Sequence, residues 1–194
     1  MIPVLQYHKL ELLDKLMLDG RKVFASYEMR DYYFDDQLKQ WLQRCDQFFE
    51  QHNGPVERSK MKSLYTDFAT LLRGTDPYSF EKIERNKRAQ ELTIGYRIAR
   101  EALQVLMDYY QLVYNRLEES KNLIGQMVLA MLQAGLITTN DIQKMTTQKH
   151  SETLWQKMAK DNQLLLVQQK VLLQTSKYDA IILLGLVLTA LRHK

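Results

Sequence analysis

The sequence predicts an all-α fold, an elongated bundle of about six or seven helices of which one or two are long. Helix breakers are rare, with 3 prolines and 7 glycines in 194 residues, and no proline follows Pro77. Apolar residues recur at three- and four-residue steps through most of the chain, as in amphipathic helices. The hydrophobic content of 45% and the charged content of 26% are those of an ordinary globular protein. We therefore expect one all-helical domain over residues 1–194.

The first part of the chain predicts two helices. One extends over about 3–19 and is followed by Gly20 as a left-handed C-terminal cap. The other extends from about 21 to 52 and is rich in aromatic residues. Several residues between 26 and 35 can cap a helix, so a break before residue 36 is an open alternative.

Two turns follow, HNGP at 52–55 and RGTDP at 73–77. Both place a glycine just past a helix end and a proline at the first position of the next helix. A short helix is expected between them, and a long one from Pro77 to about residue 119. Its beginning is almost wholly polar, which makes the 78–95 part a candidate to protrude, whereas its second half carries a clear apolar stripe.

A tight helical hairpin is predicted around residue 135. Gly135 suits the left-handed cap of a helix over about 121–134, and Thr138 with Asp141 forms a capping pattern for the next helix. The segment 146–152 has no apolar face, so a break is expected before Leu154. A final helix includes the C-terminal run YDAIILLGLVLTALRHK.

This apolar tail raises the question of what it contacts. Its uncharged core, Ala180–Leu191, would be about 18 Å long as a helix, against about 30 Å of hydrocarbon in a membrane. A longer span would include Lys177 and Asp179, so a membrane span is not expected. Burial in the protein's own core is the favoured interpretation, ahead of a partner or identical subunit and of a membrane surface. The residues predicted to bind a partner are Ile182, Leu186 and Leu191.

A second surface is a basic cluster in the middle of the chain, where residues 56–100 hold 10 basic and 6 acidic side chains. Its members are Lys82, Arg85, Lys87, Arg88, Arg97 and Arg100. The cluster is a candidate surface for anions or nucleic acid. The alternative is a solvated helix with intrahelical ion pairs, because Glu81 and Glu84 each precede an arginine by four residues.

The sequence contains no pattern that indicates a catalytic, metal or cofactor site. The four histidines stand far apart, and Cys45 lies on the same apolar stripe as Leu38 and Trp41, as a core cysteine does. Cys45 is also the only cysteine, and the first residues lack the layout of a signal peptide. A reducing, cytoplasmic location is therefore expected.

Together these observations predict a non-enzymatic helical interaction protein, an adaptor or structural subunit of a larger assembly that forms with a protein partner or by self-association. The alternative is a nucleic-acid-binding protein that uses the basic helix 82–100. An enzyme site assembled from distant helices would leave no local signature and stays open as a third interpretation.

Overall fold

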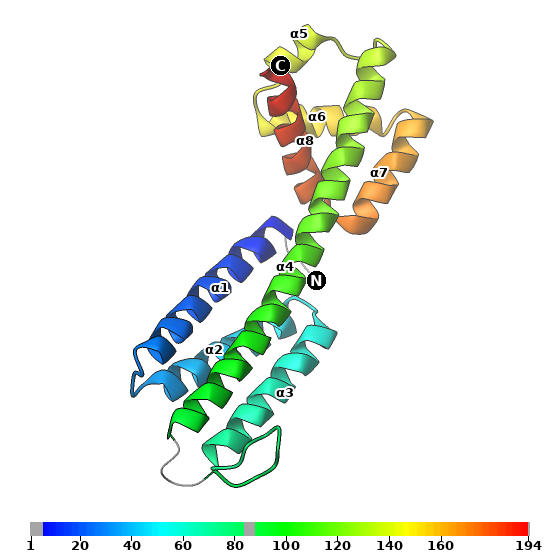
Figure 1. The fold of residues 1–194 in the computed structure, drawn as a ribbon. Coiled ribbons are helices and arrows are strands. Elements are labelled where there is room, and N and C mark those ends of the chain that lie inside the picture. Colours follow the sequence, from blue (N-terminus) through cyan, green and yellow to red (C-terminus); the bar gives the residue numbers. More distant parts are fainter. Residues whose placement is uncertain (1–5, 84–87, 194) are drawn as a thin grey trace. The chain divides into compact units, whose positions relative to one another are not determined.

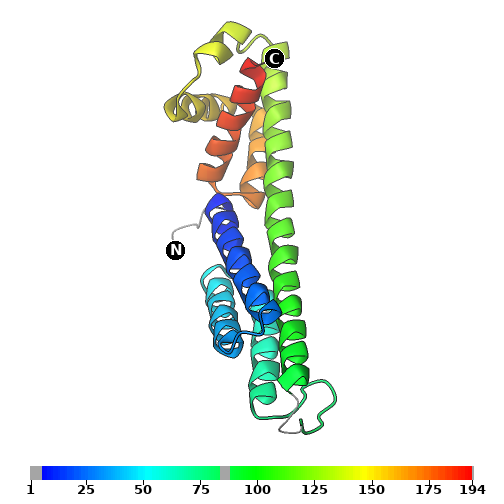
Figure 2. The ribbon, with the colours of Figure 1, turned by 60° about the vertical axis from the view of Figure 1, so that its left-hand side comes forward.

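The computed structural model describes residues 6–83 and 88–193, and within these ranges the predicted all-α fold is confirmed (Figures 1 and 2). These ranges hold no strand, only a single bridge between Thr75 and Lys82. The residues that the structure describes form eight helices: α1 (Gln6–Glu28), α2 (Phe34–Gln51), α3 (Pro55–Leu72), α4 (Arg88–Gln133), α5 (Thr139–Lys144), α6 (Gln148–Met158), α7 (Asn162–Gln174) and α8 (Lys177–Arg192).

The chain divides into two compact units. The N-unit is Leu10–Gln111, and the C-unit combines the chain up to Lys9 with Leu112–Lys194. Helices α1 and α4 therefore contribute residues to both units. The expected single domain over 1–194 and the protruding 78–95 segment stay predictions. Within that segment Leu92, Ile94 and Gly95 are buried.

The N-unit has an aromatic core built largely from α2. The predicted stripe of α2 is buried as a whole, including Phe34, Trp41, Cys45 and Phe49. The Trp41 indole packs directly against α1 and donates its Nε1–H to the Leu16 carbonyl at 2.8 Å. Burial of these large rings contributes to the stability of this unit.

Gly20 is not the helix cap that the sequence predicts. Helix α1 continues through it to Glu28, and Gly20 is buried inside the helix. A Cβ at Gly20 would lie 2.6 Å from Cζ2 of Trp41, so glycine is needed here for close packing rather than for a turn. The prediction was wrong because the ring that requires the glycine is 21 positions away in the sequence.

Helix α1 ends in a Schellman motif. Arg30 takes the left-handed position, with φ of 52°, and the N–H of Asp31 donates to the Ser26 carbonyl at 2.9 Å. The continuous helix expected over about 21–52 is therefore wrong, because residues 21–28 belong to α1, and the alternative of a break before residue 36 is the one confirmed. Gly74 and Gly135, with φ of 78° and 68°, confirm two further predicted caps.

The two predicted Gly-Pro turns differ from expectation in detail. In HNGP the left-handed residue is Asn53, with φ of 58°, while Gly54 is the N-cap of α3 and Pro55 begins that helix. In RGTDP the proline does not begin a helix. The Asp76 carboxylate accepts the N–H of Tyr78 at 2.8 Å, and Phe80 has φ of 60°, so this segment forms a turn instead.

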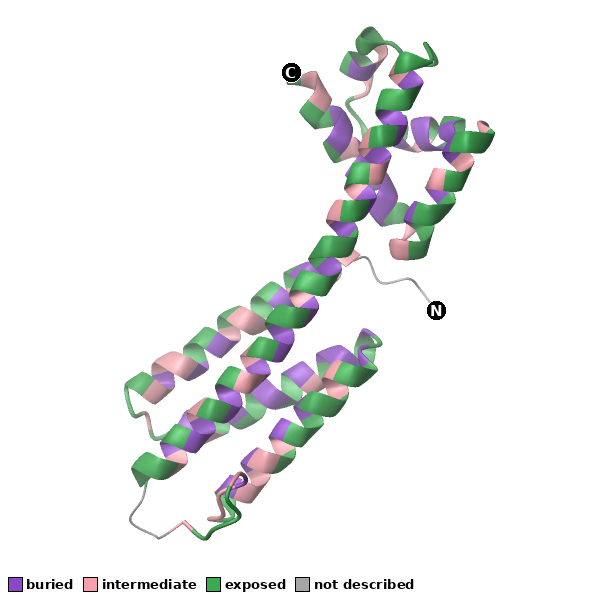
Figure 3. Ribbon diagram, turned by 45° about the vertical axis from the view of Figure 1, so that its right-hand side comes forward, coloured by how far each residue is buried: buried purple, intermediate pink, exposed green. Residues whose placement is uncertain are grey.

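The C-unit is built from the second part of α4 and from α5 to α8. The helices predicted to end near 119 and to start near 121 are one helix, because LEESKN contains no breaker, and α4 reaches 46 residues. The predicted break before Leu154 is confirmed between α5 and α6, and a further break separates α6 from α7. Figure 3 shows how buried and exposed residues alternate along these helices. Capping boxes begin α5, α6 and α8, and the Thr138–Asp141 box is the predicted one.

Candidate interaction surface

Helix α8 begins at a buried carboxylate that serves two helices. Asp179 forms a capping box with Ser176, whose hydroxyl donates to Asp179 Oδ2 at 2.8 Å. The same carboxylate accepts the backbone N–H groups of Gln6 at 3.0 Å and Tyr7 at 3.4 Å, at the start of α1. Asp179 is 0% exposed. One side chain therefore satisfies N–H groups at the beginnings of two helices in the C-unit.

Most of the apolar tail lies in the core of the C-unit. Two faces of α8 are buried, and they carry Ala180, Ile181, Leu183, Leu184, Val187 and Leu188. The surrounding side chains come mainly from α5, α6 and α7, with which α8 makes its helix–helix contacts. This burial explains why the helix is apolar on more than one face.

One apolar face of α8 remains exposed. Tyr178, Ile182 and Leu186 are 60%, 39% and 46% exposed, and their spacing of four residues places them on one line along the helix. We call these three residues the α8 strip. None of the three side chains of the strip is charged, and no charged residue lies between Asp179 and Arg192. Of the predicted partner-binding residues, Ile182 and Leu186 belong to it, whereas Leu191 is half-buried.

Tyr178 is not among the partner-binding residues predicted from the sequence, although its spacing places it on the same helix face as two of them. It lies four residues before Ile182 and eight before Leu186, on the same helix face. The uncharged core of the tail, Ala180–Leu191, begins after Asp179 and does not include the tyrosine. An aromatic ring with a polar hydroxyl at the edge of an apolar face is typical of protein interfaces.

The basic cluster is only partly free to bind an anion. Arg85 and Lys87 lie outside the described residues. Arg88 pairs with Asp35 at 2.7 Å and with Glu91 at 3.2 Å, while Lys82 and Arg100 are exposed. The nucleic-acid surface stays a prediction, with Arg88 already bound to two carboxylates.

Arg97 is also engaged within the N-unit. Its guanidinium carbon lies 3.7 Å from the centre of the Tyr78 ring, and its Nε pairs with Glu101 at 3.0 Å. The Tyr78 hydroxyl donates to the same carboxylate, and burial, followed by the charge of Glu101, raises the pKa of Tyr78 to about 12. These contacts hold the 74–83 turn against α4, which is a structural role for Arg97.

Cys45 and the metal-ligating residue types of the described ranges bear on nucleophilic and metal chemistry. Cys45 is fully buried, and burial raises the pKa of its thiol to about 12, so the thiol stays protonated at neutral pH. In residues 6–83 and 88–193, no three His, Cys, Asp or Glu side chains gather to hold a metal ion. The active thiolate that a cysteine nucleophile needs is therefore not formed at Cys45.

Among the described helices, none is by itself both long and apolar enough to cross a membrane. Helices α7 and α8 reach the required length and composition only when taken together, and the pair bends by 116° at the break between them.

Comparison of the chain with protein-family models, with curated proteins and with solved structures yields no match.

Proposed function

We propose that this chain is a non-enzymatic helical interaction protein of the cytoplasm, a structural subunit or adaptor, and that a second copy of the chain docks on the α8 strip. The observation that supports this proposal is the strip itself, an uncharged line of Tyr178, Ile182 and Leu186 exposed on a helix whose other faces are buried. Exposed apolar surface costs free energy in water, and such lines commonly mark contact sites.

A second copy fits the strip because the strip can pair with itself. In a two-fold symmetric contact each copy presents the same patch. If two α8 helices lie antiparallel, Ile182 of one copy lies beside Leu186 of the other. Because the side chains of the strip are uncharged, this contact brings no two like charges of the strip together. Repulsion between like charges therefore does not oppose self-pairing.

The size of the strip predicts a weak dimer. Tyr178 and Leu186 are eight residues apart, about 12 Å along the helix. Stable interfaces bury about 1,200–2,000 Å² in total, which a line of three side chains does not supply alone. Self-association should therefore be reversible and should depend on concentration.

The test is light scattering on a size-exclusion column at several loading concentrations, without detergent. The mass should rise from that of the 23.0 kDa chain toward twice that value as the concentration increases. Leu186→Asp should remain monomeric throughout, with helicity near that of the unmodified chain, because a buried carboxylate at the contact is costly. The matched control is Leu129→Asp, at a leucine of α4 that is 48% exposed, against 46% for Leu186, and it should still dimerise.

Two outcomes contradict the proposal. One is a monomer at every concentration. The other is unchanged dimerisation in Leu186→Asp, which would place the contact elsewhere. If Leu186→Asp unfolds, Tyr178→Ser removes the most exposed side chain of the strip and answers the same question.

The same column experiment also tests the alternative that the protein binds nucleic acid. Absorbance is recorded at protein and nucleic-acid wavelengths, and a binder using residues 82–100 would carry nucleic acid that is lost as salt rises. A gel shift that retains no probe at low salt would remove this alternative.

A further inference from the structure

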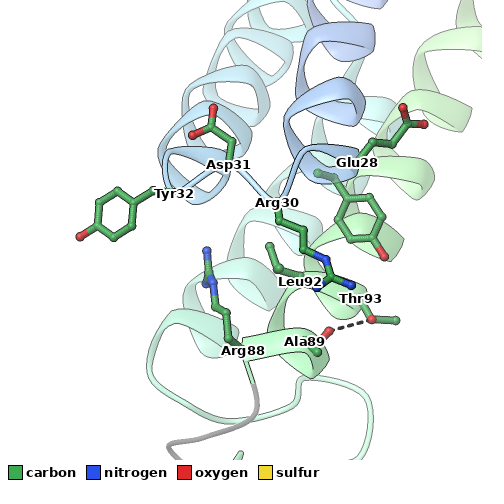
Figure 4. Close-up of a pocket in the computed structure, with 9 residues that line it drawn as sticks. Glu28, Arg30, Asp31, Tyr32, Arg88, Ala89, Leu92 and Thr93 are labelled. Carbon is green, nitrogen blue, oxygen red and sulfur yellow. Dashed lines mark hydrogen bonds between the residues drawn. The ribbon is translucent and has the colours of Figure 1, made fainter.

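The cleft between the end of α1 and the beginning of α4, about 610 Å³ in volume, is lined by charges of both signs (Figure 4). Its lining contains Glu28 and Asp31 as well as Arg30 and Arg88. Arg88 is already paired with Asp35 at 2.7 Å. Such a mixture favours neither an anionic nor a cationic ligand.

A smaller hollow lies beside the α8 strip in the C-unit, and we call it the α6–α8 hollow. It is formed by α6 and the beginning of α8, and its lining residues are Glu152, Gln156, Lys177, Tyr178 and Ile181. Its volume of about 230 Å³ is below the range of small-molecule sites, about 300–1,000 Å³. Because Tyr178 belongs to the strip, a helix that docks on the strip also lies beside the hollow. The hollow therefore suits a side chain of the docked copy better than a separate ligand.

Glu152 gives this hollow a carboxylate that no described cation neutralises. Its Oε1 accepts from Gln148 Nε2 at 3.2 Å, and this donor is neutral. Lys177 also lines the hollow, but neither it nor any other described residue forms an ion pair with Glu152. The carboxylate can therefore accept a cation from outside the unit.

Arg192, near the other end of α8, is also not neutralised. Its Nη2 donates to Thr189 Oγ1 at 2.7 Å, and its Nε is buried without a hydrogen-bond partner. It forms no ion pair within residues 6–83 and 88–193. Hydrogen bonds between a guanidinium and a carboxylate are stronger than those to a neutral hydroxyl. Arg192 therefore has donors available for a carboxylate of another copy.

Arg192 and the α6–α8 hollow lie on the same side of the strip. Arg192 follows Ile181, which lines the hollow, by eleven residues, or about three helical turns. In a two-fold antiparallel pair of α8 helices, each side of one strip meets the same side of the other strip, with the direction reversed.

The position along the helix agrees with this placement. Where Ile182 of one copy lies beside Leu186 of the other, Arg192, ten residues after Ile182, is level with Ser176, ten residues before Leu186. Side chains of a helix lean toward its N-terminus. In an antiparallel pair, the long Arg192 side chain therefore extends from the level of Ser176 toward the hollow of the other copy.

We propose that in the dimer Arg192 of each copy enters the α6–α8 hollow of the other copy and pairs there with Glu152. This inference rests on the proposed function, since it requires two copies to dock through the α8 strip. It adds two symmetric ion pairs, one at each end of the contact. These pairs fix the antiparallel direction and the register, which a line of three apolar side chains specifies weakly.

The test is a charge exchange, measured by light scattering on a size-exclusion column at several loading concentrations and low salt. Glu152→Arg and Arg192→Glu each bring like charges together at both ends of the contact. Each variant alone should dimerise at least about tenfold more weakly than the unmodified chain. The double variant, Glu152→Arg with Arg192→Glu, should recover dimerisation because opposite charges meet again.

An equal mixture of the two single variants should also form dimers. In a mixed dimer of Glu152→Arg and Arg192→Glu, both contacts join opposite charges, whereas neither variant has this advantage alone. The matched control is Lys170→Glu, which changes the net charge as Arg192→Glu does, at an exposed residue of α7 outside the hollow. It should dimerise like the unmodified chain.

Circular dichroism checks the helicity of each variant. If a charge-reversed variant unfolds, Glu152→Gln, Arg192→Gln and their combination form a double-mutant cycle that measures the same interaction. A coupling of zero in this cycle overturns the pairing.

The outcomes separate this inference from the proposed function. A monomer at every concentration for the unmodified chain overturns both. If the unmodified chain dimerises and Leu186→Asp does not, the α8 strip is supported. In that case, single variants that dimerise normally, or a double variant and a mixture that both fail to recover dimerisation, overturn only the pairing of Arg192 with Glu152. Equal weakening by Lys170→Glu also overturns the pairing, because net charge alone would then explain the effect.

Discussion

The carboxylate of Asp179 accepts hydrogen bonds at the starts of two helices. It accepts from the Ser176 hydroxyl at 2.8 Å and from the Gln6 N–H at 3.0 Å, and it is fully buried. The first N–H groups of a helix have no partner within the helix, so a buried helix start needs an acceptor from elsewhere. Asp179 supplies that acceptor to α8 and to α1 at the same time.

Replacing this carboxylate should therefore lower the stability of the C-unit. Asp179→Asn exchanges one acceptor oxygen for an amide donor that faces backbone donors, and it should lower the free energy of unfolding of the C-unit by about 2–3 kcal/mol. Chemical denaturation followed by circular dichroism measures this. Asp141→Asn is the matched control, since Asp141 caps only α5 with Thr138 at the surface, and it should cost clearly less. Equal losses in the two variants would show that the second helix contributes nothing.

At the scale of the elements, two glycines inside helices have opposite roles. Gly20 in α1 faces Trp41, where a Cβ would meet the ring at 2.6 Å, whereas Gly125 in α4 has nothing within 4 Å of such a Cβ. Both positions are helical, so alanine gains helix propensity of about 1 kcal/mol at each of them. Only at Gly20 does a steric clash, at about 1–3 kcal/mol, oppose that gain.

Gly20→Ala should thus destabilise the N-unit by about 1 kcal/mol, and Gly125→Ala should stabilise the C-unit by up to about 1 kcal/mol. Both values come from the shift of the denaturation midpoint at constant slope. An increase in stability for Gly20→Ala would mean that α1 and the Trp41 ring move apart easily, against the packing described.

At the scale of the whole molecule, each unit has its own buried core. Cys45 lies in that of the N-unit, with its thiol fully buried and protonated. A thiol reacts as its thiolate and only when it is accessible, so labelling of Cys45 reports opening of the N-unit.

This gives a test of whether the two cores open separately. Gly20→Ala should accelerate alkylation of Cys45 about fivefold, the factor that corresponds to about 1 kcal/mol, because it destabilises the same unit. Asp179→Asn, which acts in the C-unit, should leave the rate unchanged. Equal acceleration by both variants, measured by mass spectrometry at constant pH, would show that the molecule opens as one cooperative unit.

The features that the sequence alone determined are those whose partners are close in the chain. Gly74 and Gly135 end helices, and Thr138 with Asp141 starts one, because these interactions join residues within a few positions of each other. The all-α class follows for the same reason, since it depends on the scarcity of breakers and on a periodic apolar pattern.

Only the tertiary structure decided which role each ambiguous residue takes. Gly20 serves Trp41 instead of a turn, Asp179 caps a second helix 173 positions away, and Arg30 occupies a position where glycine would be expected. Packing also decides which faces of the C-terminal helix are buried and which face is exposed. The apolar sequence of the tail does not determine this, because it is compatible with burial on any side. The arrangement of α5, α6 and α7 around α8 buries most of its apolar residues and leaves the line of Tyr178, Ile182 and Leu186 exposed. Contacts between distant residues depend on which surfaces meet in three dimensions, and a local pattern does not contain that information.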